Sequence, residues 1–228
     1  MSNYTVDTLE LGQFTTESGE TIQNLKLKYE HVGYPGQPLA LVCHVLTGNH
    51  LTYGTDEHPG WWREIIDGGY MPINDYQFLT FNVIGSPFGS SSKHNDPHFP
   101  DHLTLRDIVR ALEKGIEALG FNKIDILIGG SLGGMQALEL LYNRRFQVDK
   151  AVILAATDKT SSYSCAFNEI ARQAIHIGGK EGLSIARQLG FLTYRSSKSY
   201  DQRFTPEEVV SYQPVSYTHL TLPTILLV

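Results

Sequence analysis

The feature that most constrains the fold is an apolar strand, a glycine-rich turn and a helix in direct succession. Residues 124–128 (IDILI) predict a buried strand, and residues 135–141 (MQALELL) are strong helix formers. Between them lies GGSLG at 129–133, a G-x-S-x-G sequence. We expect a strained backbone at Ser131, because a Cβ on either outer glycine would collide with the neighbouring strand or helix.

Strand, G-x-S-x-G and helix together form the nucleophile elbow of α/β-hydrolase architecture. The elbow would hold Ser131 Oγ at the carboxyl edge of the sheet, where the helix dipole favours developing negative charge. In this architecture one oxyanion-hole amide follows the nucleophile, and the other follows an earlier strand. Here these are Leu132 and, after the apolar strand 39–45 (LALVCHV), Leu46. The alternative is a glycine-rich strand-to-helix turn without catalytic meaning.

The chain alternates strands and helices up to residue 157. Two alternating runs, at 5–11 and 25–30, predict an antiparallel hairpin that turns at Ser18-Gly19 and has one solvent-exposed face. The elements that follow are a strand at 77–83, a helix after the capping box TLRD at 104–107, and a strand at 150–156. We therefore predict an α/β-hydrolase core over residues 1–157, with a mostly parallel sheet and antiparallel N-terminal strands.

After residue 157 the pattern changes to helices alone, at 165–177 and 180–195, which predicts a helical lid over residues 158–213. On the second helix Arg187 and Tyr194 share one stripe with an intervening glycine. A cation and a phenol on one face would make a carboxylate-binding notch. Spacing alone favours a solvated arginine on the lid surface.

Composition excludes several classes of function. The net charge of −6, without a long basic run, argues against a nucleic-acid surface. No run of 18 or more apolar residues predicts a membrane span, and we expect no signal peptide at the N-terminus. Cys43 and Cys165 lack a disulfide-framework spacing, so we expect a reduced, cytoplasmic protein.

Three histidines, His94, His98 and His102, are spaced evenly at four residues. Pro97 and Pro100 break any helix that would place them on one face, so we expect a solvated loop and no metal site.

Several segments resemble those of homoserine O-acetyltransferases, among them the elbow with its helix, the loop after strand 39–45, and the second predicted lid helix. They read GGSLGGMQALE (129–139), CHVLTGNH (43–50, with Val45 in place of the family's alanine) and GLSIARQLGFLTYRS (182–196). The resemblance covers residues 1 to about 213. It implies the α/β-hydrolase fold with a helical lid.

The resemblance also implies an activity: transfer of an acetyl group from acetyl-CoA to the side-chain hydroxyl of L-homoserine, in methionine synthesis. The elbow serine would carry the acetyl group, and the amides of Leu46 and Leu132 would bind the oxyanion. Thr47, Arg187 and Tyr194 would hold the amino acid. Such an enzyme needs no metal and no bound cofactor, because acetyl-CoA is a co-substrate. Relatives suggest a homodimer, with small molecules as the other partners.

A nucleophilic serine needs a histidine base oriented by an acid. The histidines after Ser131 are His176, in a predicted lid helix, and His219. His219 lies in 214–228, where the composition changes abruptly, and we expect that tail to be non-native; the alternative is a true C-terminal strand. Asp158 could be an acid but lacks a histidine. We therefore expect the triad Asp and His, and the last sheet strands, to be absent from this chain, which would be inactive alone.

Other functions stay open on the sequence. One is a serine esterase on the same fold. Another is an acyltransferase that uses a different donor, such as succinyl-CoA, or serine as acceptor. A third is an inert fragment. A carboxylate clamp at Arg187 would distinguish the transferase from the esterase.

Overall fold

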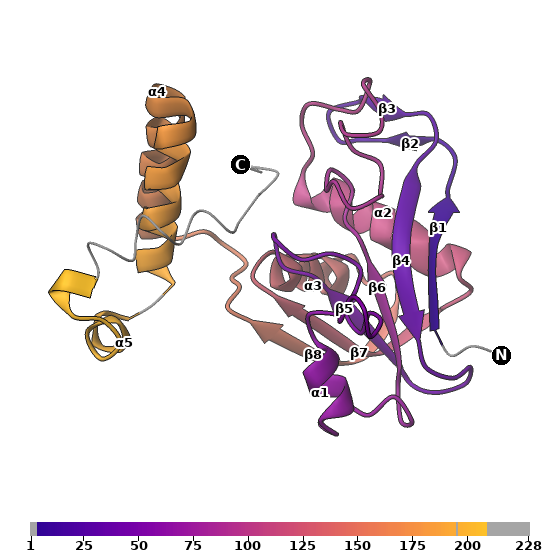
Figure 1. Cartoon of the computed structure of the whole chain (residues 1–228). Coiled ribbons are helices and arrows are strands. Elements are labelled where there is room, and N and C mark those ends of the chain that lie inside the picture. The colour runs from indigo at the N-terminus through magenta and orange to yellow at the C-terminus, as the bar shows by residue number, and fades with distance from the viewer. Residues whose placement is uncertain (1–3, 195, 209–228) are drawn as a thin grey trace. The chain divides into compact units, whose positions relative to one another are not determined.

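The computed structural model describes residues 4–194 and 196–208 (Figure 1). They form two compact units, the first ending at Asp158 and the second beginning at Lys159. The predicted tail at 214–228, with His219, lies outside the described residues. Among the described residues, no helix has the length and apolar character needed to cross a bilayer.

The first unit is built on a six-stranded sheet in the order β1-β4-β6-β5-β7-β8 (Figure 1). β1 pairs with β4, and β4 with β6, in antiparallel fashion, whereas β6-β5, β5-β7 and β7-β8 are parallel. This confirms the predicted sheet, mostly parallel with antiparallel N-terminal strands. In sheet order the strands are Tyr4–Glu10, Lys26–Val32, Gln77–Phe81, Leu39–Cys43, Lys123–Gly130 and Gln147–Leu154.

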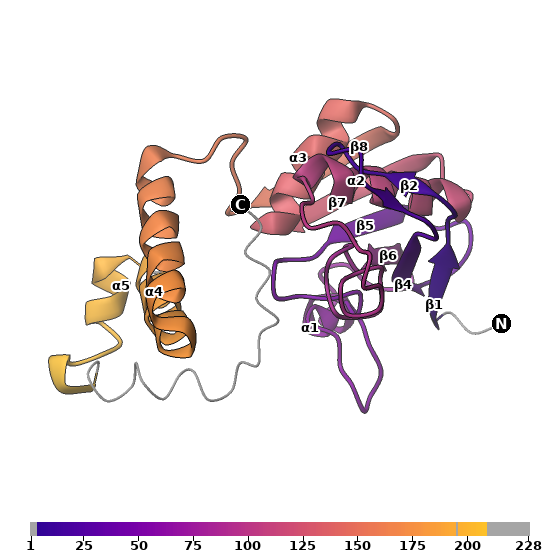
Figure 2. The same ribbon diagram turned by 90° about the horizontal axis from the view of Figure 1, so that it is seen from above.

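Helices cover both faces of this sheet (Figure 2). α2 (Leu105–Ala118) and α3 (Leu132–Asn143) pack on one face, and the short α1 (Arg63–Asp67) packs on the other. Within β5, Leu39, Leu41 and Cys43 join the first cluster, while Ala40 and Val42 join the second. Because successive side chains of a strand point to opposite faces, an entirely apolar strand has to be covered on both sides, as predicted.

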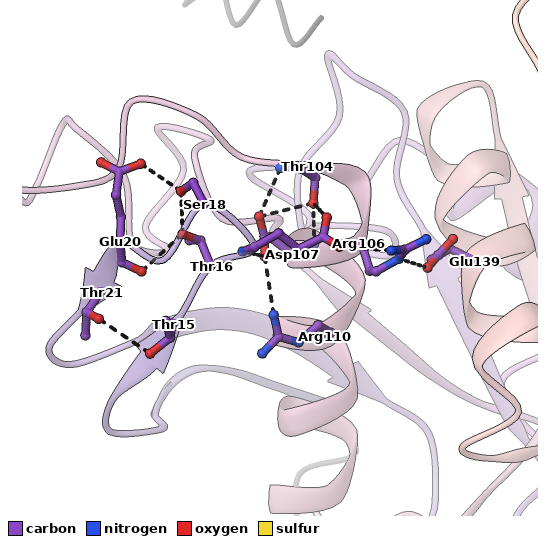
Figure 3. Close-up of polar contacts among 11 residues, drawn as sticks. Thr15, Thr16, Ser18, Glu20, Thr21, Thr104, Arg106, Asp107, Arg110 and Glu139 are labelled. Atoms are coloured by element: carbon purple, nitrogen blue, oxygen red, sulfur yellow. Dashed lines mark hydrogen bonds and ion pairs between the residues drawn. The ribbon is translucent and has the colours of Figure 1, made fainter.

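The predicted capping box starts α2 (Figure 3). Thr104 Oγ1 accepts a hydrogen bond from the Asp107 N–H at 3.1 Å, and the Asp107 carboxylate accepts one from the Thr104 N–H at 3.1 Å. Arg106 on the same turn bonds Glu139 of α3 at 3.0 Å. The start of α2 is thereby tied to the helix that follows the elbow.

The N-terminal hairpin differs from its prediction in two respects. β1 and β4 do pair, but the Ser18-Gly19 turn belongs to a second, two-stranded sheet of β2 (Phe14–Thr15) and β3 (Thr21–Ile22). The expected solvent-exposed face is also wrong for β4. Glu30, on the polar side of the alternation, is only 2% exposed, because a later loop folds over it.

The second unit contains α4 (Ser162–Thr193) and α5 (Ser197–Asp201). α4 consists of two helical segments that meet at Gly179, whose φ of 52° and ψ of −119° are not helical. A Cβ on Gly182 would lie 1.8 Å from the Ala174 carbonyl oxygen, so the segments approach closely after this bend. The break falls where the sequence separates two predicted helices.

Candidate active site

Ser131 lies exposed at the turn between β7 and α3, with φ 53° and ψ −121°. This is the strained backbone predicted from the sequence. The two outer glycines explain how it is tolerated. A Cβ on Gly129 would lie 2.1 Å from the Gly133 oxygen, and one on Gly133 would lie 2.0 Å from the Cys43 oxygen. The turn is therefore closed so tightly that only glycine fits at its ends.

The close approach of Gly133 to Cys43 also brings the loop after β5 to the elbow. β5 and β7 are neighbouring parallel strands, paired at Cys43 and Gly129, so their carboxyl ends meet at one sheet edge. Gln136 of α3 donates from Nε2 to the His44 oxygen at 3.3 Å. Leu46 and Thr47, which come next, are exposed, Leu46 at 51%. The structure thus brings the segment with Leu46 and Thr47 to the edge where Ser131 lies.

Leu132, the second expected oxyanion amide, begins α3 directly after Ser131. The first four N–H groups of a helix have no intrahelical acceptor, so this amide is available to a ligand. The Ser131 N–H is already used, because it donates to the Leu154 oxygen of β8 at 2.9 Å. The elbow is thereby anchored to β8 as well as to β5.

His44, at the end of β5, is buried, and both of its ring nitrogens are occupied. Nε2 accepts the Val83 N–H at 3.1 Å, so the ring proton is on Nδ1, which donates to the Val45 oxygen at 2.7 Å. Burial lowers the pKa of His44. A neutral histidine of fixed tautomer therefore joins the ends of β5 and β6, and it is not a base for Ser131.

Sequence reasoning did not single out His44 or Glu30. The available signal for His44 was a histidine inside an otherwise apolar strand, and for Glu30 it was a carboxylate in a run that the fold buries. His44 accepts a hydrogen bond from Val83 just before the loop that carries Leu46 and Thr47, and Glu30 accepts one from Thr52 within that loop.

Arg187 and Tyr194 belong to the second unit, on the second segment of α4. Arg187 is half-buried, and Tyr194, at the helix C-terminus, is 86% exposed. The approach of these side chains to Ser131 stays a prediction.

The remaining candidates for acid, base and metal ligand are dispersed. His176 lies in α4, as predicted, and Asp158 is exposed at the end of the first unit. Among the described residues, no histidine hydrogen-bonds the Ser131 hydroxyl, and no group of three His, Cys, Asp or Glu side chains is arranged to hold a metal ion.

The sequence profile of the alpha/beta hydrolase fold matches residues 38–177. The chain belongs to the alpha/beta hydrolase fold family. It is 81% identical to the crystallised homoserine O-acetyltransferase from Staphylococcus aureus. That match has a TM-score of 0.88 and covers 94% of this chain and 65% of that one.

Two further proteins show how far the similarity extends in sequence and in fold. A curated homoserine O-acetyltransferase from Methanobrevibacter ruminantium is 35% identical over 219 residues, which cover 83% of this chain and 45% of that protein. The crystal structure of esterase E22 is 19% identical, with a TM-score of 0.75 over 93% of this chain and 72% of that one, and it shows the fold alone. This chain spans about half the length of the curated relatives that it matches. The predicted resemblance to homoserine O-acetyltransferases is confirmed.

Proposed function

We propose that the protein to which this chain belongs transfers an acetyl group from acetyl-CoA to the side-chain hydroxyl of L-homoserine. The observation that carries the proposal is the 81% identity, over 94% of the chain, to a protein named homoserine O-acetyltransferase. The exposed, strained Ser131 supports it, because a serine at such an elbow is positioned for nucleophilic attack.

The reaction would proceed in two steps. Ser131 Oγ attacks the thioester carbonyl of acetyl-CoA, the amides of Leu46 and Leu132 donate to the oxyanion, and the C–S bond breaks to release CoA. The homoserine hydroxyl then attacks the acetyl-serine ester, and Ser131 leaves with a proton restored. In each step a base takes the proton of the attacking hydroxyl and returns it to the leaving group. We assign this base and its acid partner to the part of the relatives that this chain does not cover.

For the acceptor, we propose that Arg187 binds the homoserine carboxylate, with help from Thr47 and Tyr194. A guanidinium forms two parallel hydrogen bonds with a carboxylate, which fixes the orientation of an amino acid as well as its charge. The half-buried position of Arg187 supports this role, since partial exclusion of water strengthens such a pair.

The reaction as written uses acetyl-CoA as a co-substrate and involves no resident metal or cofactor. We place the proposed enzyme in methionine synthesis in the cytoplasm, where the free Cys43 and Cys165 would stay reduced. A homodimer with small-molecule substrates is part of the same proposal.

The test is an acyl-transfer assay on the full-length protein, obtained by reading the encoding DNA onward from codon 205. We expect CoA release that requires L-homoserine, ping-pong kinetics, and loss of activity in Ser131→Ala. L-serine and succinyl-CoA serve as alternative substrates. We expect the 228-residue chain alone to be inactive. Ester hydrolysis without transfer to any amino acid would refute the proposal and favour a serine esterase, which the same elbow would serve.

A further inference from the structure

A buried carboxylate on β4 receives three successive backbone amides from the loop that carries Leu46 and Thr47. Glu30 Oε2 accepts hydrogen bonds from the N–H groups of Thr52 at 2.7 Å and Tyr53 at 2.8 Å, and Oε1 accepts one from Gly54 at 2.7 Å. The Tyr4 hydroxyl also bonds this carboxylate. Glu30 is 2% exposed, so all of these bonds lie away from bulk water.

Among the residues that the structure describes, Glu30 forms no salt bridge. The charge of Arg63 lowers the pKa of Tyr4, the hydrogen-bond partner of Glu30, but Arg63 forms its ion pairs with Asp56 and Asp67. Burial raises the pKa of Glu30, and the three amides and the Tyr4 hydroxyl oppose that rise. Burying an unpaired carboxylate is costly unless several donors converge on it. Because three of these donors come from one loop, the arrangement indicates that the buried Glu30 carboxylate serves to hold that loop.

The loop in question joins β5 to α1, and its two arms are bonded to each other. The Trp61 indole Nε1 donates to the Asn49 oxygen at 3.1 Å, and the Trp61 N–H donates to the Leu51 oxygen at 3.2 Å. The Gly60 N–H donates to the Tyr53 oxygen at 2.8 Å. Glu30 therefore anchors one arm directly and the other through these bonds.

Leu46 and Thr47 lie between two anchors of this loop. On one side, His44 is held to Val83, and on the other side the Glu30 carboxylate holds the amides that begin at Thr52. Within the short span between them, the Gly48 N–H closes a turn onto the Val45 oxygen at 2.9 Å, and Asn49 Oδ1 accepts the Leu51 N–H at 2.8 Å. These two hydrogen bonds therefore restrict the backbone of the span that carries Leu46 and Thr47.

We propose that Glu30 is a positioning residue, which fixes the loop so that the Leu46 amide and Thr47 stay aligned with Ser131. The roles of Leu46, Thr47 and Ser131 in this proposal rest on the proposed function. The anchoring of the loop by Glu30 does not, because the order of the loop can be measured without any substrate. A carboxylate suits the task better than an amide, because it accepts all three N–H groups, whereas the NH₂ of glutamine would face one of them.

The chain supplies its own probe of the loop. Its two tryptophans, Trp61 and Trp62, both belong to the anchored segment, so the intrinsic tryptophan fluorescence of the whole chain reports on this loop. For Glu30→Gln we expect a red-shifted emission and greater acrylamide quenching. We also expect amide hydrogen exchange at Thr52, Tyr53 and Gly54 to be faster by at least about tenfold, since one bond becomes a donor–donor contact.

Two further variants make the measurement specific. Glu10→Gln makes the same chemical change on the neighbouring β1 strand, where Glu10 is exposed and paired with Lys26, and it should leave emission and exchange unchanged. If Glu30→Gln does not fold, Tyr4→Phe removes one donor at an edge strand. It should then shift the tryptophan signal in the same direction by a smaller amount.

The catalytic readout is the rate per active site in the full-length protein, normalised by the burst of acetyl-serine formation. We expect Glu30→Gln to lower this rate by about 10- to 100-fold, as displaced catalytic groups do. A merely structural role would reduce the burst amplitude and leave the rate per site unchanged.

The proposal is overturned if Glu30→Gln keeps the wild-type emission and exchange, or if its rate per site equals that of the wild type. If the wild type transfers no acetyl group to L-homoserine, the proposed function fails. The rate per site is then measured with p-nitrophenyl acetate, and the same two results decide the role of Glu30.

Discussion

At the scale of single residues, the site depends on backbone positions that only certain side chains tolerate. Ser131 has a positive φ, and a Cβ on Gly129 or on Gly133 would collide with a backbone carbonyl oxygen. Backbone atoms cannot rotate away as a flexible side chain can. The strain at Ser131 is therefore held by the packing of β5, β7 and α3 around it.

This packing predicts a large difference between two neighbouring glycines. Gly133→Ala should lower the free energy of unfolding by at least about 2 kcal/mol, because its Cβ would lie 2.0 Å from the Cys43 oxygen. Gly130→Ala is the matched control and should stay within about 1 kcal/mol, because its Cβ would meet no atom closer than 3.7 Å. Urea unfolding of both variants measures the difference. Equal losses would contradict the steric explanation of the elbow.

A second prediction at this scale concerns pH. Burial lowers the pKa of His50 from its ordinary value of 6.5 to about 4, and it lowers the pKa of His44 as well. Between about pH 4 and pH 6.5, the unfolded chain thus binds protons that the folded chain does not bind. The contribution of these histidines to the free energy of unfolding is therefore complete above about pH 6.5 and is lost as the pH falls toward 4. For His50 alone the loss approaches about 3 kcal/mol.

The measurement is urea unfolding at pH 7.5, 6 and 5. His50→Asn should reduce the loss between pH 7.5 and 5, whereas the same substitution at the exposed His58 should not. If His50→Asn leaves the pH dependence as in the wild type, then His50 is not kept neutral by burial.

The sequence predicted the residues whose signal is local and missed those whose role depends on distant contacts. Ser131 and Leu132 follow from five consecutive residues, because the turn and its glycines are adjacent in the chain. Glu30 looked solvent-exposed, since a period-2 run cannot show that residues 52–54 will fold over its polar side. His44 was missed for the same reason, since its partner Val83 comes 39 residues later.

At the scale of elements, local signals placed most helices and strands but not all of their ends. The capping box located the start of α2, and Gly179 separates the two segments of α4. β8, predicted at 150–156, is Gln147–Leu154, because pairing with β7 begins at Gln147. The small β2-β3 sheet was not predicted, since two-residue strands are too short to show an alternation.

β8 is the last strand of the sheet among the described residues, and it leads to a prediction about association. Val152 is 43% exposed and Leu154 is 50% exposed, and residues 151–154 carry no charge. The charges of β8, at Asp149 and Lys150, lie in its first half, so the apolar second half of this edge lacks charges that would oppose pairing with other chains. Val152→Lys should lower the light scattering of the chain at rising concentration. Val6→Lys on β1, the opposite edge, should have little effect, because Asp7 and Glu10 already protect that strand. Equal effects at both edges would show that β8 is not the site of association.

At the scale of the whole molecule, the proposed site is divided between two units. The first carries Ser131, Leu46 and Thr47 at one sheet edge, and the second carries Arg187 and Tyr194 on α4. In the proposed function, the elbow chemistry and the choice of acceptor therefore belong to different parts of the chain. Sequence pattern predicted the change from strand–helix alternation to helices, but it contains no information about how side chains in the two parts would meet.

This division predicts that acceptor binding can be removed without removing the nucleophile. In the full-length protein, Arg187→Ala should lower kcat/KM for L-homoserine by about 100-fold or more, because a charge-assisted, bidentate bond to the carboxylate is lost. Arg187→Lys keeps the charge without the fork and should fall in between. p-Nitrophenyl acetate has no carboxylate to bind, so its hydrolysis should change less than about twofold in both variants.

If Arg187→Ala transfers acetyl groups to L-homoserine at the wild-type rate, then Arg187 does not hold the acceptor. If both activities fall together, the second unit supports the elbow itself, and the separation of chemistry from acceptor choice is wrong.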